Sequence, residues 1–175
     1  DQALVDIGNG RSTGILILHV TSAGNQLRAK IANVDTDFAW TPTLNTWSRI
    51  LIYRRNSILR AFVNGVQVGA NAANTANINS TSFTTVAAEK DGTQKTRGYF
   101  SHVQIWNRAI TNSEYEQAHQ APGTLPGLVL YLPIFGQQSP EPDLSGNKLN
   151  ATLVGAPAIS NINVGSGRIS KGRRS

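Results

Sequence analysis

The chain of 175 residues contains no cysteine and no methionine. Without cysteine there is no disulfide scaffold, no thiolate metal site and no cysteine nucleophile. A newly translated chain begins with methionine, whereas this one begins DQALVDIG. The missing methionine predicts a processed product or a piece of a longer polypeptide.

Charge is also scarce, because Asp, Glu, Lys and Arg make up only 15% of the residues. This content is well below the usual quarter and excludes a disordered polyelectrolyte. Hydrophobic residues reach 39%, and the chain is long enough for one domain with a core. A polar, uncharged chain with 16 glycines is typical of β-structure with many turns.

The net charge of +6 is concentrated at the C-terminal end. Residues 161–175 hold four basic residues and no acid, and without these four the net charge falls to about +2. We therefore interpret residues 161–175 as a flexible basic tail, and we do not expect a folded nucleic-acid-binding face. No run of 18 apolar residues occurs, so we expect no membrane insertion.

Hydrophobic patterning predicts about nine strands. The continuous apolar runs at 14–20 (GILILHV) and 127–135 are typical of strands covered on both faces, and 26–32 alternates with Leu, Ala and Ile on one face. Asn64-Gly65 predicts a two-residue hairpin that pairs Val63 with Val66, with the apolar residues of both strands on one face.

One helix is predicted in TNSEYEQAHQ, where Thr111 and Glu114 form a capping box. Ile110 and Tyr115 have the spacing of a hydrophobic staple. Many strands with one short helix predict an all-β sandwich or barrel, and the long apolar runs favour two large stacked sheets.

Three stretches together resemble one family. They are WSRILIY with LRAFVNGVQV, GYFSHVQIWNRAITNSEY at 98–115, and LVLYLPIFG…DLSGNKLNATL at 128–153. They are similar to laminin-G-like and pentraxin-like domains of the concanavalin A-like lectin/glucanase superfamily. This resemblance implies an antiparallel jelly-roll β-sandwich of two stacked sheets with one short helix.

The order of these stretches differs from the family pattern, in which the block resembling 128–153 normally opens the domain. We expect residues 1–160 to form one laminin-G-like sandwich. Alternatively, residues 128–160 open a second module that residues 1–175 do not complete.

Catalysis is not expected. Glucanases of the resembled superfamily hold two carboxylates on one strand, about 5 Å apart across the bond. Here Glu114 and Glu116 lie on the predicted helix and point to different sides, and no strand carries two glutamates that face the same way. No G-x-S-x-G or HExxH motif supports a triad or a zinc site.

Two loop positions are candidate sites. The resemblance implies calcium at loop carboxylates, for which Glu89 with Asp91 is the metal-site prediction. Trp40 with Asp35, Asp37 and Asn33 is the predicted ligand site, because exposed aromatics stack on sugars while Asn and Asp hold hydroxyls. Asp35 with Asp37 is a second candidate pair for calcium, and Trp40 could equally plug the end of the sandwich.

The sequence thus predicts a non-catalytic, lectin-like binding or adhesion module of a larger extracellular or virion surface protein, such as those of phages. The alternative is a capsid-decoration or fibre component whose sandwich contacts neighbouring protein subunits. A glycan hydrolase is the weaker alternative. Glycan binding needs an exposed Trp40, whereas assembly needs a large apolar patch or an edge strand paired to a neighbour.

Overall fold

The computed structural model describes residues 1–8, 12–22, 24–78, 84–89, 91–134, 139–152 and 154. The described residues form mostly antiparallel strands with one short α-helix, which confirms the predicted fold class. The elements are β1 Gln2–Ile7, β2 Ile15–Val20, β3 Gln26–Ile31, β4 Val34–Ala39, β5 Ile50–Arg55, β6 Ile58–Val63, β7 Val66–Ala73, β8 Thr84–Val86, β9 Val103–Trp106, α1 Asn112–Gln120, a 3₁₀ turn at Pro122–Thr124, and β10 Leu128–Leu132.

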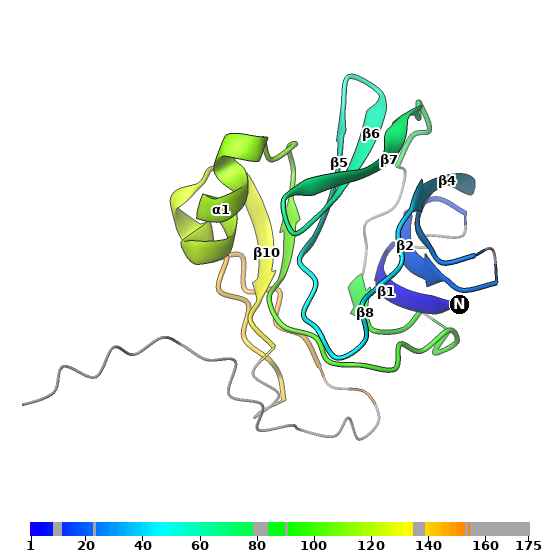
Figure 1. The fold of residues 1–175 in the computed structure, drawn as a ribbon. Coiled ribbons are helices and arrows are strands. Elements are labelled where there is room, and N and C mark those ends of the chain that lie inside the picture. Colours follow the sequence, from blue (N-terminus) through cyan, green and yellow to red (C-terminus); the bar gives the residue numbers. More distant parts are fainter. Residues whose placement is uncertain are drawn as a thin grey trace, which may run out of the picture.

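The strands form three hydrogen-bonded groups. A five-stranded sheet has the order β4-β3-β2-β1-β8, a three-stranded sheet the order β5-β6-β7, and β10 pairs with β9. Figure 1 shows α1 and β10 at one side of the molecule and β1, β2 and β4 at the other, with β5, β6 and β7 above them. The five-stranded sheet is one layer, and the two smaller groups lie against its inner face.

Side-chain alternation defines this inner face. Ala29 of β3 lies opposite Ile17 of β2, and both point inward. The three-stranded sheet covers β3 and β4 through a core of buried side chains: Leu27, Ala29, Ile31, Phe38, Leu59 and Ala61. The β9–β10 pair covers the other end of the sheet, where Leu130 and Leu132 are in a cluster that also contacts Val5 and Val86. The middle strand, β2, lies between the two covered regions.

The apolar run of β2 was predicted to be covered on both faces, and the structure covers one face fully and the other in part. Leu16, Leu18 and Val20 are buried on the outer face, whereas Ile15 and Ile17 on the inner face are only partly buried. In β5, Ile50 to Arg54 are all partly buried and none is fully buried. Within the described residues, the opposing layer leaves these positions partly exposed, although the composition of the runs suits full burial.

The predicted hairpin is confirmed in its register. Val63 pairs with Val66, and both Asn64 and Gly65 adopt positive φ, as a type I′ turn requires. The shared apolar face is confirmed as well, because Leu59 and Ala61 of β6 lie in the core and Val68 of β7 packs against it. Val66, next to the turn, is 68% exposed, and Phe62 on the opposite face of β6 is buried.

Gly69 of β7 is required by both its conformation and its surroundings. Its φ is +64°, and an added Cβ would lie 3.0 Å from the Cα of Phe38. We expect Gly69→Ala to lower the free energy of unfolding by about 3 kcal/mol, from left-handed strain plus overpacking. The control is Gly24→Ala, where φ is +84° with no heavy atom within 4 Å, at a cost of about 1 kcal/mol. If urea denaturation gave the same loss of unfolding free energy for both variants, the packing of Gly69 against Phe38 would not explain the effect.

The block at 128–153 contributes strand β10, which pairs antiparallel with β9 of the same chain. Glu141 and Ala151 form an isolated antiparallel bridge farther along the block. The domain boundary near residue 160 and the predicted basic tail at 161–175 lie outside the described residues, so both stay predictions.

Candidate functional site

A large cleft lies between the layers, with a volume of about 2050 Å³. Sites for small molecules typically measure about 300–1,000 Å³, so this cleft is sized for part of a polymer. We call it the inter-sheet cleft and define it by its floor on β1, β2 and β3, one wall on β5, the opposite wall on β9, and a contribution from α1.

The floor is the inner face of the five-stranded sheet. From β2, every second residue lines the cleft, namely Ile15, Ile17 and His19. This alternation is expected where a cavity lies over the face of a strand, because successive side chains point to opposite faces. The floor is therefore mostly aliphatic.

The walls differ from the floor. In the wall strands consecutive residues line the cleft, whereas in β2 every second residue does. All residues from Arg49 to Arg54 and all residues from Ser101 to Arg108 contribute. Consecutive lining residues are expected where a cavity runs along the edge of a strand, because both faces of the strand then border it. Within the described part of the chain, β5 pairs only with β6 and β9 only with β10, so each has one unpaired edge. The cleft lies along these two edges.

Hydrogen-bond directions show which backbone groups of β5 point into the cleft. Asn64 N donates to Arg49 O at 2.9 Å, so Arg49 directs its carbonyl toward the β6 side. The direction of the backbone groups alternates along an antiparallel strand. Ile50, Ile52 and Arg54 therefore direct their N–H and C=O groups away from β6.

The same argument applies to β9. Tyr131 of β10 lies opposite Gln104, but Tyr131 N donates to Asp143 Oδ1 at 2.9 Å, and Tyr131 O accepts from Leu144 N at 2.9 Å. Both backbone groups of Tyr131 thus point away from β9, which makes Tyr131 and Gln104 a non-hydrogen-bonded pair. Gln104 accordingly directs its own N–H and C=O groups away from β10.

Helix α1 is fixed against the start of the β5 wall. Tyr115 Oη donates to Arg49 O at 3.1 Å, and the Arg49 guanidinium lies 4.5 Å from the centre of the Tyr115 ring. Arg49 also forms two hydrogen bonds with Glu116, at 2.7 and 3.0 Å. The hydrogen bond from Arg49, with some opposition from desolvation, lowers the pKa of Glu116.

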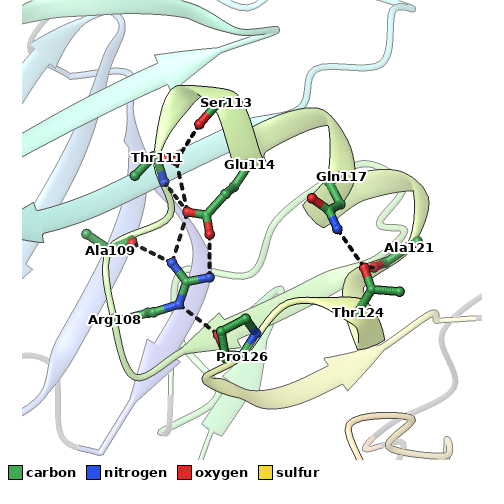
Figure 2. Close-up of polar contacts among 9 residues, drawn as sticks. All are labelled: Arg108, Ala109, Thr111, Ser113, Glu114, Gln117, Ala121, Thr124 and Pro126. Carbon is green, nitrogen blue, oxygen red and sulfur yellow. Dashed lines mark hydrogen bonds and ion pairs between the residues drawn. The ribbon is translucent and has the colours of Figure 1, made fainter.

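The N-terminus of α1 is the predicted capping box, which is confirmed (Figure 2). Glu114 Oε2 accepts from Thr111 N at 3.0 Å, and both carboxylate oxygens accept from Arg108, at 2.7 and 2.9 Å. Arg108 Nε donates in turn to Pro126 O at 2.7 Å. The bonds from Arg108, followed by those from Thr111, lower the pKa of Glu114 to about 2.

This cap predicts a pH effect on stability. The folded-state pKa of Glu114 is below its ordinary value of 4.5, so its stabilisation is present above that value and is lost as pH falls toward about 2. We expect Tm of Glu114→Gln to be below that of the native chain at neutral pH, and the difference to shrink as pH falls through this window. Thermal denaturation followed by circular dichroism measures the Tm of the two chains at each pH. A difference in Tm that stays constant from neutral pH to pH 2 would contradict the view that the ionised Glu114 carboxylate stabilises the fold.

The structure does not bring the predicted glycan-site residues to one face. Asp35 and Asp37 lie on strand β4, not in a loop, and face outward, where Arg28 and Lys30 pair with them. Trp40 packs against the inner core, with its ring edge-on to His19 at 5.7 Å between centroids.

Asn33 lies in the turn between β3 and β4, with φ +67°. Asp35 and Asp37 point outward while Trp40 packs inward, so the structure does not bring these side chains together. A ligand role for any of these residues alone stays a prediction.

The predicted metal residues lie in one turn. Glu89 is buried, and Asp91 Oδ1 accepts from the N–H and the hydroxyl of Thr93 at 2.9 and 2.6 Å. Within the described ranges, no group of three or more His, Cys, Asp or Glu side chains could hold a metal ion. Calcium at Glu89 and Asp91 stays a prediction.

The DLSGN motif forms a hydrogen-bonded loop beside β10 whose function the sequence did not reveal. The Asp143 carboxylate accepts from the N–H groups of Tyr131, Ser145 and Leu149, each at 2.9 Å, and from the Ser145 hydroxyl at 2.8 Å. Burial opposes ionisation, but these hydrogen bonds outweigh it and lower the pKa of Asp143. The loop thereby occupies the edge of β10 that faces away from β9.

The inter-sheet cleft was not predicted either. The only signal in the sequence is that the runs in β2 and β5 are apolar at almost every position. Such runs are typical of complete coverage, and the unfilled cleft becomes visible only when the partner of each face is known.

Comparison with known proteins gives one match. The family model described as the concanavalin A-like lectin/glucanases superfamily matches residues 1–114. No curated protein and no solved structure matches the chain. Among the described helices, none combines the length and the apolarity that crossing a bilayer requires.

Proposed function

The chain belongs to the concanavalin A-like lectin/glucanase superfamily, and we propose that it is a non-catalytic module that binds a segment of another protein in its inter-sheet cleft. At the superfamily level, membership supports a carbohydrate- or protein-binding module. Laminin-G-like domains commonly occur in extracellular proteins, and the proposal places this module in a larger extracellular or virion surface protein.

The observation that carries the proposal is the cleft itself. Its volume of about 2050 Å³ exceeds that of a small-molecule site, and its floor is aliphatic. Aliphatic side chains gain free energy by covering one another, whereas sugar hydroxyls need polar partners. The aliphatic floor therefore favours a polypeptide over a glycan.

The charges in the cleft agree with a non-catalytic function. None of the described residues that line it is Asp or Glu. Hydrolysis of a glycosidic bond by the usual route needs two carboxylates flanking that bond. The cleft offers no such pair among its described residues.

Trp40, the aromatic residue of the predicted glycan site, is separated from its predicted partners. It packs against the core and lines the cleft, edge-on to His19, whereas the two aspartates lie on the outer face. The aspartates predicted to assist it are paired with Arg28 and Lys30, so sugar hydroxyls would have to compete with those ion pairs.

The test exposes the full chain to a glycan array and to a phage-displayed library of random octapeptides. We expect enriched octapeptides and no bound glycan. Ile17→Trp places a larger side chain in the floor of the cleft and should abolish peptide binding. Val66→Trp, the same side chain at an exposed position on β7, should preserve it. Glycan binding that survives Ile17→Trp, with no enriched peptide, would contradict the proposal.

A further inference from the structure

We infer that His102 and His119 form a two-histidine site for a zinc ion, at the place where the end of α1 meets the start of β9. The site goes beyond the proposed function and does not depend on it. It also uses none of the residues that the sequence predicted for calcium. A zinc ion bound there would join α1 to the β9–β10 pair.

The two histidines come from separate elements that the fold brings together. His102 directly precedes β9, and His119 lies in the last turn of α1. Figure 1 shows α1 beside β10, the strand that pairs with β9. Both imidazole side chains are exposed, and their ring centroids lie 5.8 Å apart. Because packing makes this pair, the absence of an HExxH motif does not exclude it.

The separation of the two rings suits a shared metal ion. Zinc binds a histidine nitrogen at about 2.0–2.1 Å and is usually four-coordinate and tetrahedral. Two imidazoles on one such ion therefore have their ring centroids roughly 5–6 Å apart. The distance of 5.8 Å between His102 and His119 is within this range, and the ring planes cross at 73°. The two rings are thus already close enough to bind one ion.

The surroundings of His102 hold its ring and leave one nitrogen for a ligand. Ser101 Oγ lies 2.5 Å from His102 Nδ1, so this nitrogen has a hydrogen-bond partner. The Tyr131 ring stacks on the other ring at 6.1 Å between centroids, with 20° between the planes. Metal-binding histidines typically use one ring nitrogen for the metal and the other for a hydrogen bond of this kind. The nitrogen of His102 that would bind zinc is therefore Nε2.

The backbone of His102 is unusual in a way that also fixes the residue. Its φ is +57°, in the left-handed region that few residues other than glycine adopt. Its N–H donates to Pro133 O at 3.2 Å, which ties the residue to the end of β10. Such backbone conformations cluster at functional sites. The position of the His102 ring is thus set by the strands and by its neighbours together.

The donor set selects zinc over calcium. Imidazole nitrogen suits zinc and similar transition metals, whereas calcium takes oxygen ligands. Glu116 lies one turn before His119, but both its carboxylate oxygens accept from Arg49, at 2.7 and 3.0 Å. Within the ranges that the structure describes, no third His, Cys, Asp or Glu completes the site. The chain therefore supplies two ligands, and water fills the other positions.

The helix end favours a cation at this place. The C-terminal end of an α-helix carries a partial negative charge, which stabilises positive groups within the last turn. His119 lies in that turn of α1. A zinc ion on His119 would therefore add its charge at the favourable end of the helix.

The experiment titrates zinc chloride into the full chain and follows the side-chain resonances of its three histidines by NMR. We expect the resonances of His102 and His119 to change along one saturating curve. His19 of β2, whose ring packs edge-on against Trp40, is the internal reference and should not respond. Calcium chloride at the same concentrations should change none of the three.

Two variants remove one ligand each. His102→Asn supplies a side chain that tolerates positive φ, and His119→Gln supplies a good helix former, so both variants are expected to fold. Each should weaken zinc binding at least about tenfold in isothermal titration calorimetry, because a single histidine cannot chelate the ion. Zinc should also raise Tm of the native chain, because it binds the folded state, and it should not raise Tm of either variant.

Three results would overturn the inference. The first is no saturable response up to millimolar zinc. The second is an equal response of all three histidines. The third is an unchanged affinity in either variant, which would show an adventitious ion only. Octapeptide binding is measured separately, so none of these results decides the proposed function.

Discussion

Replacing Asp143 by alanine is expected to lower the free energy of unfolding by about 4 kcal/mol. The side chain is buried and accepts hydrogen bonds from three backbone N–H groups and one hydroxyl. Each buried donor that loses its acceptor costs about 1–3 kcal/mol, with some recovery by water. Urea denaturation followed by tryptophan fluorescence measures the loss.

The matched control for this variant is Asp37→Ala. Asp37 is an aspartate of the same chemistry whose partner, Arg28, lies on the exposed outer face of the sheet at 2.6 Å. An exposed ion pair contributes at most about 1 kcal/mol. Similar losses in the two variants would contradict the view that the Asp143 loop fixes β10, and with it the β9 wall of the cleft.

Replacing Phe38 by alanine is the second prediction of large effect. Phe38 is fully buried in the core between β3, β4 and β6, and it contacts the backbone position of Gly69. Loss of a buried phenyl group costs about 3–5 kcal/mol, because the transfer free energy is lost and a cavity remains. We expect this loss in urea denaturation, together with increased exposure of Trp40.

Val34→Ala is the control on the same strand. Val34 is 47% exposed, so its truncation should change the free energy of unfolding by no more than about 0.5 kcal/mol. If Phe38→Ala were as mild as Val34→Ala, the two layers would not be joined by this core, and the floor of the cleft would not be rigid.

Features set by local signals were predictable from the sequence. The turn at Asn64-Gly65 needs positive φ at two residues, and few sequences supply that more readily. The cap formed by Thr111 and Glu114 depends on residues three apart. Both are properties of a short segment, so they do not depend on what packs around it.

Features that depend on distant partners were predicted less well. Strand β4 has the sequence VDTDFA, in which Thr36 and Phe38 alternate with Asp35 and Asp37. The aspartates suggested a loop, because acids are rare in strands. The alternation was the usable signal, since Arg28 and Lys30 alternate in the same way on β3 and pair with these acids.

The cleft could not be predicted from local signals at all. Strand β5 has the composition of a central strand, and only the sheet topology shows that one of its edges has no partner among the described strands. The same holds for β9. The exposed edges are a property of how three groups of strands are arranged around β2.

The most direct measurement is amide hydrogen exchange by NMR on the full chain, with and without a selected octapeptide. In the free chain, the amides of Ile50, Ile52 and Gln104 should exchange quickly, because their groups point into the cleft. With the octapeptide bound, these amides should become protected while those on the outer edge of β7 do not change. Protection of β7 alone, or no change at Ile52 and Gln104 under saturating peptide, would contradict the account.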